Sequence, residues 1–261
     1  MKYQGKTQMG FSSLQELYMS GVQWEITDTP LVRANIQTQP SPQPQSAQSG
    51  SANRTACIVP PIAPAAPISV ETVESMANRP NDINALNRMI AEFNHPLRTS
   101  ATNPVLIHVA PNPNGLIIVT DIPSADDDAT GDILSGTHGE MLDKMINAIG
   151  MSRENVSIMP MLFWRTPGGR TPTGDEIALA RPFVNRALEL IKPRAILTLG
   201  SIPAFEIANI NLGRAHGVPV TQENGTIIMP IYHPNYLMLK PTAKRDVWNA
   251  LQNLQILLKS A

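Results

Sequence analysis

Two side chains that can do chemistry, the carboxylate of Asp121 and the imidazole of His233, each follow a short apolar run. Residues 116–119 precede Asp121, and residues 226–231 precede His233. A carboxylate can stabilise a developing cation or orient a water molecule, and an imidazole can donate a hydrogen bond to an oxygen that gains negative charge. If both runs are strands of one parallel sheet, the two side chains lie at its carboxyl edge, where such sheets bind ligands.

The elements that must position these side chains alternate along the chain from Val70 onward. Apolar runs typical of buried parallel strands cover residues 116–119, 156–162, 195–199 and 226–231. Apolar residues at helical spacing cover residues 83–93, 141–149, 177–191 and 247–258. Thr173 and Glu176 form a capping box before the third helix. This alternation predicts an α/β fold, with a mostly parallel four-stranded central sheet and helices on both faces in three layers, α/β/α.

Composition divides the chain into three segments. Residues 1–35 hold a short amphipathic patch and predict a small helical segment, for which we hypothesise a protein partner. Residues 36–69 are rich in Pro, Gln, Ser and Ala and predict a disordered linker. Residues 70–261 predict the folded domain.

Charge and cysteine usage exclude several classes of protein. The net charge of -1 gives no global attraction to nucleic acid, so a DNA-binding surface would need local clusters of Lys and Arg. The single cysteine, Cys57, excludes an intramolecular disulfide framework and a metal cluster held only by thiolates of this chain. No apolar run reaches the roughly 18 residues of a membrane-spanning helix, and the first residues do not resemble a signal peptide. We therefore expect a cytoplasmic monomer with no membrane partner.

Four segments at the expected strand ends resemble the motifs of one family. They are Asp121 to Asp128 with Gly131, Gly136 and Gly139, Phe163 to Thr173, Leu199 with Gly200, and His233 to Leu237. In order and spacing they are similar to the family 4 uracil-DNA glycosylases, and the amino-terminal layout resembles that of alphaproteobacterial members. The resemblance implies a uracil-DNA glycosylase fold. It also implies a DNA glycosylase of base excision repair, which hydrolyses the N-glycosidic bond of a flipped deaminated base, above all uracil, in damaged DNA.

The same resemblance assigns roles to individual residues. Asp121 matches the family's catalytic Glu and would stabilise the sugar cation and orient water, while His233 would donate a hydrogen bond to the base. The base pocket is assigned to Ile122, Pro123, Leu134 and Pro160. Contacts with DNA are assigned to Ser124, Arg165, Arg170, Pro234 and Asn235. These contacts must offset the cost of flipping a base, roughly a few kcal/mol.

The chain departs from the family at the pocket and at the cofactor. Asp is one methylene shorter than Glu, Pro160 replaces an Asn that pairs with the base edge, and Leu134 replaces an aromatic residue that stacks on the base. The four cysteines that hold the family's four-iron cluster match Glu92, His95, Trp164 and Ala180. We therefore expect no cofactor, no metal ion and no four-iron cluster, with Trp164 and its apolar neighbours filling the space.

Ordinary structural roles compete with these assignments. Asp121 can cap the turn after its strand, and His233 can be a structural residue at a strand end. Arg165 and Arg170 can be charges on a solvated loop, and residues 126–128 can be a solvated acidic turn, although the resemblance suggests that one of these acids shapes the pocket. The remaining histidines are expected at the surface or in loops: His95, His108, His138 and His216.

Two other functions stay open. The first is a catalytically inactive DNA-binding or interaction protein that retains the glycosylase fold, because loss of the pocket Asn and aromatic is what decay of a site would produce. The second is a generic nucleotide-binding α/β domain. The second has less support, since the chain contains neither a Gly-x-Gly-x-x-Gly motif nor a phosphate-loop lysine.

Overall fold

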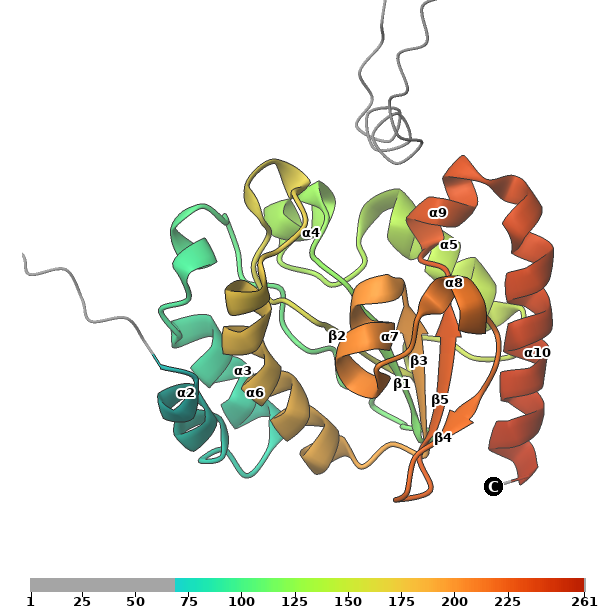
Figure 1. Cartoon of the computed structure of the whole chain (residues 1–261), viewed down its shortest axis with the longest axis horizontal. Coiled ribbons are helices and arrows are strands. Elements are labelled where there is room, and N and C mark those ends of the chain that lie inside the picture. Colours follow the sequence, from blue (N-terminus) through green and yellow to red (C-terminus); the bar gives the residue numbers. More distant parts are fainter. Residues whose placement is uncertain (1–68, 261) are drawn as a thin grey trace, which may run out of the picture. The chain divides into compact units, whose positions relative to one another are not determined.

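The computed structural model describes residues 69–260, in which helices surround a central sheet (Figure 1). The sheet contains the strands β1 (Leu116–Thr120), β2 (Ser157–Pro160), β3 (Ala195–Leu199), β4 (Val220–Thr221) and β5 (Ile227–Ile231). The predicted segment 1–35 and residues 36–68 of the predicted linker lie outside the described residues, so both stay predictions.

The strands are arranged in the order β2-β1-β3-β5-β4. β1 pairs in parallel with β2 and β3, and β3 pairs in parallel with β5. The predicted mostly parallel sheet is confirmed. The predicted count of four strands is wrong, because β4 adds an antiparallel edge to β5. Its two residues, Val220 and Thr221, are exposed and form no apolar run, so a search for buried strands misses them.

Helices precede, connect and follow the strands. They are α2 (Val70–Ala77), α3 (Ile83–Glu92), α4 (Ala125–Thr130), α5 (Gly136–Asn147), α6 (Gly174–Ile191), α7 (Ser201–Ala208), α8 (Leu212–Ala215), α9 (Pro234–Leu239) and α10 (Lys244–Ser260), with short 3-10 turns at Pro96–Thr99, Pro167–Gly169 and Pro241–Ala243. The capping box predicted from Thr173 and Glu176 opens α6. In residues 69–260 no helix has both the length and the apolar character needed to cross a membrane.

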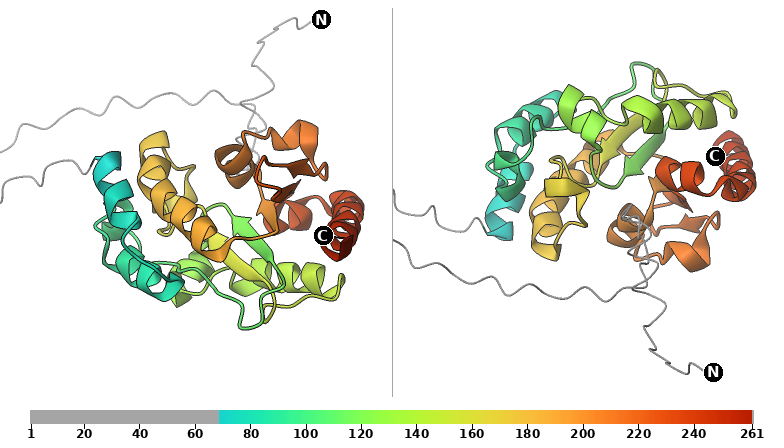
Figure 2. Two further views of the ribbon diagram at one scale, coloured as in Figure 1. Left: turned by 90° about the horizontal axis from the view of Figure 1, so that it is seen from below. Right: turned by 90° about the horizontal axis from the view of Figure 1, so that it is seen from above.

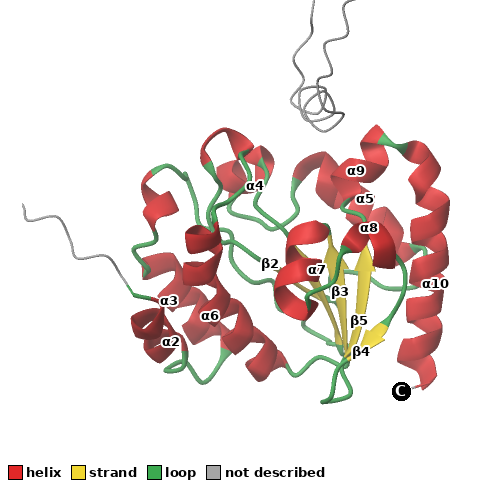
Figure 3. Cartoon of the chain, in the orientation of Figure 1, coloured by secondary structure: helices red, strands yellow, loops and turns green. Residues whose placement is uncertain are grey.

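Side chains of β1 alternate between two hydrophobic cores. Ile117 and Val119 pack in a core with buried residues of α2, α3, α6 and α7. Leu116 and Ile118 pack in a second core with buried residues of α5 and α10. Alternate residues of a strand point to opposite faces of a sheet, so helices cover both faces, as Figures 2 and 3 show. The predicted three layers are confirmed.

The parallel strands end together at one edge of the sheet. Thr120 lies in register with both Pro160 and Leu199, and Leu199 lies in register with Ile231. The residues that follow these strand ends therefore meet at the same edge, where α4 and α9 also lie (Figure 1). This edge is the place to look for a ligand site in an open α/β sheet.

Candidate active site

The carboxylate of Asp121 and the imidazole of His233 meet at this carboxyl edge. Oδ1 of Asp121 lies 3.6 Å from Nε2 of His233. Both side chains are partly covered, with 26% of the Asp121 side chain and 15% of the His233 side chain exposed. The structure therefore brings together the two residues that the sequence predicts as the catalytic pair, and leaves both partly exposed.

Gly200 lies between the two catalytic candidates because it follows β3, the strand between β1 and β5. Its φ of +102° is a conformation that side chains with a Cβ rarely adopt. A Cβ at this position would lie 3.1 Å from Oδ2 of Asp121 and 3.7 Å from Cβ of His233. Glycine thus provides both the backbone conformation and the space that the approach of the pair requires.

Two hydrogen bonds orient the ring of His233, which caps α9. The backbone N–H of Asn235 donates to Nδ1 at 3.2 Å, so the neutral ring carries its proton on Nε2. The Nε2–H of His233 donates to Oγ1 of Thr120 at 3.1 Å, on the side where Asp121 lies. Pro234 is buried in the first turn of α9 and Asn235 is exposed. Their contacts with DNA stay predictions.

Burial shifts the two titrating groups in opposite directions. Burial raises the pKa of Asp121, while the charge of His233 and the N–H of Ile122 act against this effect. Burial lowers the pKa of His233, while the charge of Asp121 acts against it. The site therefore favours a neutral His233, which keeps one N–H donor for an acceptor that develops negative charge.

The acidic turn contains one buried carboxylate, that of Asp127. Its Oδ1 accepts hydrogen bonds from the N–H and the hydroxyl of Ser135, at 2.6 and 2.8 Å. Its Oδ2 accepts the N–H of Ser124 in the capping box that opens α4. Asp127 thus joins the start of α4 to the start of α5, and a role in shaping the pocket stays a prediction. The Ser124 hydroxyl serves the same cap, so its contact with DNA stays a prediction without support from this geometry.

The residues assigned to the base pocket are apolar and mostly buried. Pro123, Leu134 and Pro160 are buried and Ile122 is half-buried. Pro160 lies in register with Thr120, one residue before Asp121. Leu134 has a φ of +49° and belongs to the core beneath α5. These side chains offer no hydrogen bond to a base, so recognition there must use shape or backbone groups.

Arg165 and Arg170 differ in their partners within the loop after β2. Both terminal nitrogens of Arg170 donate to the carboxylate of Glu176, which lowers the pKa of Glu176 to about 2. That carboxylate also accepts the N–H of Thr173 at the start of α6. Arg165 is half-buried, and its Nε has no hydrogen-bond partner in the described part of the chain. Arg170 is therefore already paired, whereas Arg165 forms no ion pair in residues 69–260; contacts of either residue with DNA stay predictions.

Two of the other histidines have partners that the sequence did not indicate. His95 lies in the expected loop, between α3 and the 3-10 turn at Pro96–Thr99, but it is fully buried, and its ring stacks on Trp164 with the ring centroids 4.6 Å apart. His138 is half-buried in the first turn of α5, and its ring packs edge-to-face on His233. Sequence reasoning missed His138 because no motif singles it out. The available signal was its position between Gly136 and Gly139 of the first strand-end motif.

Comparison with known proteins agrees with the family that the sequence motifs resemble. Residues 107–255, more than half of the chain, match the model of the uracil DNA glycosylase superfamily. The chain belongs to this superfamily. A type-4 uracil-DNA glycosylase of Archaeoglobus fulgidus is 29% identical over 140 residues, which cover 50% of this chain and 70% of that protein. The predicted resemblance to family 4 glycosylases is therefore confirmed.

Two further relatives within the superfamily carry the same name. A type-4 uracil-DNA glycosylase of Thermotoga maritima is 28% identical over 146 residues, which cover 55% of this chain and 76% of that protein. One of Saccharolobus solfataricus is 29% identical over 140 residues, which cover 50% of this chain and 65% of that protein.

The expectation of a protein without a cofactor requires correction. The relatives are type-4 glycosylases, the class for which the sequence resemblance implies a four-iron cluster. Similarity to these proteins therefore contradicts the predicted absence of a cofactor. Glu92 is exposed, while His95, Trp164 and Ala180 are buried, and none of these residues supplies a thiolate. In residues 69–260 no group of three or more His, Cys, Asp or Glu side chains is placed to hold a metal ion. These four side chains do not fit the cysteine set of the family.

Proposed function

We propose that this protein is a DNA glycosylase of base excision repair, which hydrolyses the N-glycosidic bond of a flipped deaminated base, uracil first. Membership of the superfamily supports a hydrolase that acts on N-glycosyl bonds, and the type-4 relatives support uracil in DNA as the substrate. The observation that carries the proposal is the placement of the Asp121 carboxylate 3.6 Å from the His233 imidazole at the carboxyl edge of the sheet.

Asp121 acts on the sugar in this proposal. As the N-glycosidic bond lengthens, its electron pair leaves with the base and the sugar gains positive charge. The ionised carboxylate stabilises this cation and orients a water molecule, whose oxygen forms the new bond to the sugar carbon. The proton that this water loses balances the negative charge that leaves with the base. Partial burial strengthens the interaction, because a site with little water screens charges less than bulk solvent does.

His233 acts on the departing base. The bond from the Asn235 N–H to Nδ1 keeps the proton of the neutral ring on Nε2. In the complex with DNA, the Nε2–H of His233 donates to a base oxygen as negative charge develops on the base. Thr120 holds the same N–H in the free protein, so binding of the nucleotide exchanges one hydrogen-bond acceptor for another.

The test is release of uracil from single- and double-stranded oligonucleotides, detected by alkaline cleavage at the abasic sites that form. The wild type is expected to release uracil. Asp121→Asn and His233→Ala are each expected to lower the single-turnover rate by about 100- to 1000-fold, since each removes a group that stabilises transition-state charge. Asp132→Asn, which changes an exposed acid in the loop before α5, is the matched control and should keep the wild-type rate.

A second candidate is a DNA-binding protein without catalysis that retains the glycosylase fold. It is favoured by the buried apolar side chains of Leu134 and Pro160, which give the pocket no polar group for a base edge. If the wild type releases no deaminated base while salt-sensitive DNA binding persists, this second function replaces the first. A monomeric state, a cytoplasmic location and a partner for residues 1–35 stay predictions.

A further inference from the structure

His138 lies beside the catalytic pair although it belongs to another element. It is in the first turn of α5, whereas His233 caps α9 and Asp121 follows β1. The centroids of the His138 and His233 rings are 5.7 Å apart, and the ring planes make an angle of 81°. The edge of one imidazole therefore meets the face of the other, and the half-buried His138 remains partly open to solvent.

Electrostatic effects show the same proximity. Burial is the main cause that raises the pKa of Asp121, and the charge of His138 is among the effects that oppose it. Burial is also the main cause that lowers the pKa of His233, and the charge of His138 adds to that lowering. A charge on His138 thus favours both an ionised Asp121 and a neutral His233, the two states that the proposed mechanism uses.

The hydrogen-bonding capacity of His138 is unused by the described part of the chain. In His95, one ring nitrogen accepts the N–H of Leu97 and the other donates to the carbonyl of Glu176. Both ring nitrogens of His233 also have partners. No hydrogen bond within residues 69–260 engages the ring of His138, so its two nitrogens are left for water or a ligand.

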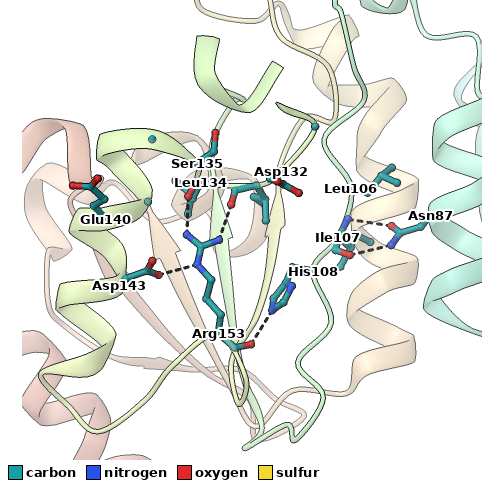
Figure 4. A pocket seen from close by; sticks show the side chains of 14 residues that line it. Asn87, Leu106, Ile107, His108, Asp132, Leu134, Ser135, Glu140, Asp143 and Arg153 are labelled. Atoms are coloured by element: carbon teal, nitrogen blue, oxygen red, sulfur yellow. Dashed lines mark hydrogen bonds and ion pairs between the residues drawn. The ribbon is translucent and has the colours of Figure 1, made fainter. Parts of the chain in front are cut away.

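The backbone before His138 is held in an unusual conformation. Leu134 has a φ of +49° and Gly136 a φ of +59°. The carbonyls of Ile133 and Leu134 accept hydrogen bonds from the guanidinium of Arg153, at 2.9 and 2.6 Å (Figure 4). A positive φ is unfavourable for a leucine and persists only where surrounding contacts impose it. The turn that leads to His138 is therefore fixed by the fold.

Close packing fixes the first turn of α5 as well. A Cβ on Gly139, the residue after His138, would overlap the carbonyl oxygen of Leu134 and approach the guanidinium of Arg153. Arg153 is itself held by Asp143, whose Oδ1 accepts the Arg153 Nε–H at 2.8 Å. A cavity of about 660 Å³ lies against the same turn, and these side chains line it (Figure 4). The helix can approach the turn this closely only because residue 139 is glycine.

We propose that His138 is a third catalytic residue, which hydrogen-bonds directly to the extruded deoxyribonucleotide beside Asp121 and His233. This inference rests on the proposed function, because it names a further group at the same site. The ligand is the sugar and base of a nucleotide that has left the DNA stack. The ring of His138 packs against His233, and its free nitrogens are the groups that meet the nucleotide.

Three variants separate hydrogen bonding from packing. His138→Phe keeps an aromatic ring against His233 but removes both nitrogens, and is expected to lower single-turnover uracil release by about 10- to 100-fold. His138→Asn keeps a hydrogen-bonding group. On a logarithmic scale, its decrease in rate is expected to be at least one third smaller than that of His138→Phe. His216→Phe is the matched control, because His216 is also half-buried and stacked on a ring, that of Tyr232, and it should keep the wild-type rate.

A wild-type rate in folded His138→Phe would overturn the inference, since ring packing alone would then suffice. If His138→Phe does not fold, the wild type decides by nuclear magnetic resonance of its histidine ring protons, titrated with a duplex that carries a tetrahydrofuran abasic site. The His138 signal is expected to shift, and an unchanged signal at saturation would overturn the proposal. Because this titration requires no catalysis, failure of uracil release by the wild type counts against the proposed function and leaves the His138 contact to be decided by the titration.

Discussion

Two regions that carry motif residues, the ends of β1 and β5 and the loop after β2, use their polar side chains in different ways. At the first, Asp121 and His233 lie close together and remain partly exposed. At the second, Arg170 is engaged by Glu176, and Trp164 is buried against His95. A motif thus locates a backbone segment. The partners of each side chain then determine whether that side chain can act on a ligand or stabilises the fold.

The aromatic packing of the second region should dominate stability. Trp164 is fully buried and contacts the rings of His95, Phe93 and Phe163. Trp164→Ala should lower the free energy of unfolding by about 3–5 kcal/mol, because it leaves a cavity in a close-packed core. Trp248→Ala is the control, since 39% of Trp248 is exposed, and it should cost less than about 1 kcal/mol. Denaturant unfolding measures both, and equal losses would contradict a structural role specific to Trp164.

The turn before α5 should affect catalysis, as the ends of β1 and β5 do. Arg153→Met removes the donors to the carbonyls of Ile133 and Leu134, and should lower uracil release by about 10-fold, since small displacements of a catalytic group are costly. Arg186→Met is the control. Arg186, in α6, donates twice to the carbonyl of Pro80, which lies between α2 and α3, and pairs with Glu189. If the two variants are equally stable and lose similar amounts of activity, the turn before α5 makes no specific contribution to the catalytic site.

The carboxylate of Glu176 should make the free energy of unfolding depend on pH in the acidic range. Its pKa of about 2 in the folded protein lies below its ordinary value of 4.5, chiefly because Arg170 donates to it. The stabilisation is therefore complete above pH 4.5 and is lost as the pH falls from 4.5 to about 2. Glu176→Gln should lower the free energy of unfolding at neutral pH by about 1–2 kcal/mol, through the weakened cap of α6. Urea titrations across this pH range measure the effect, and identical curves for both proteins would rule it out.

The smallest expected effect concerns DNA affinity. Arg165→Met should weaken binding of a uracil-containing oligonucleotide by a few-fold and reduce its salt dependence by about one phosphate contact. Arg170→Met should leave the affinity nearly unchanged at low temperature, because the Arg170 guanidinium is already paired with Glu176. Fluorescence anisotropy at several salt concentrations distinguishes them. A larger loss for Arg170→Met would reverse the assignment of the phosphate contact.

Local pattern was sufficient for most elements and for the proximity of Asp121 and His233. The apolar run at 195–199 matches β3, and the capping box at Thr173 and Glu176 opens α6 as expected. Asp121 and His233 could be predicted from motifs at strand ends, because parallel strands bring their carboxyl ends to one edge. The antiparallel strand β4 could not, since its two exposed residues carry no periodic signal.

Only the tertiary structure decided which polar groups are free to act. Asp127 looks like its neighbours Asp126 and Asp128 in sequence, yet it alone of the three is buried and joins two helices. His138 lies between two glycines of the first motif and has no role assigned by it, yet its helix places it against His233. The physical reason is that strands and caps follow from neighbouring residues, whereas burial and hydrogen-bond partners depend on contacts between residues far apart in the chain.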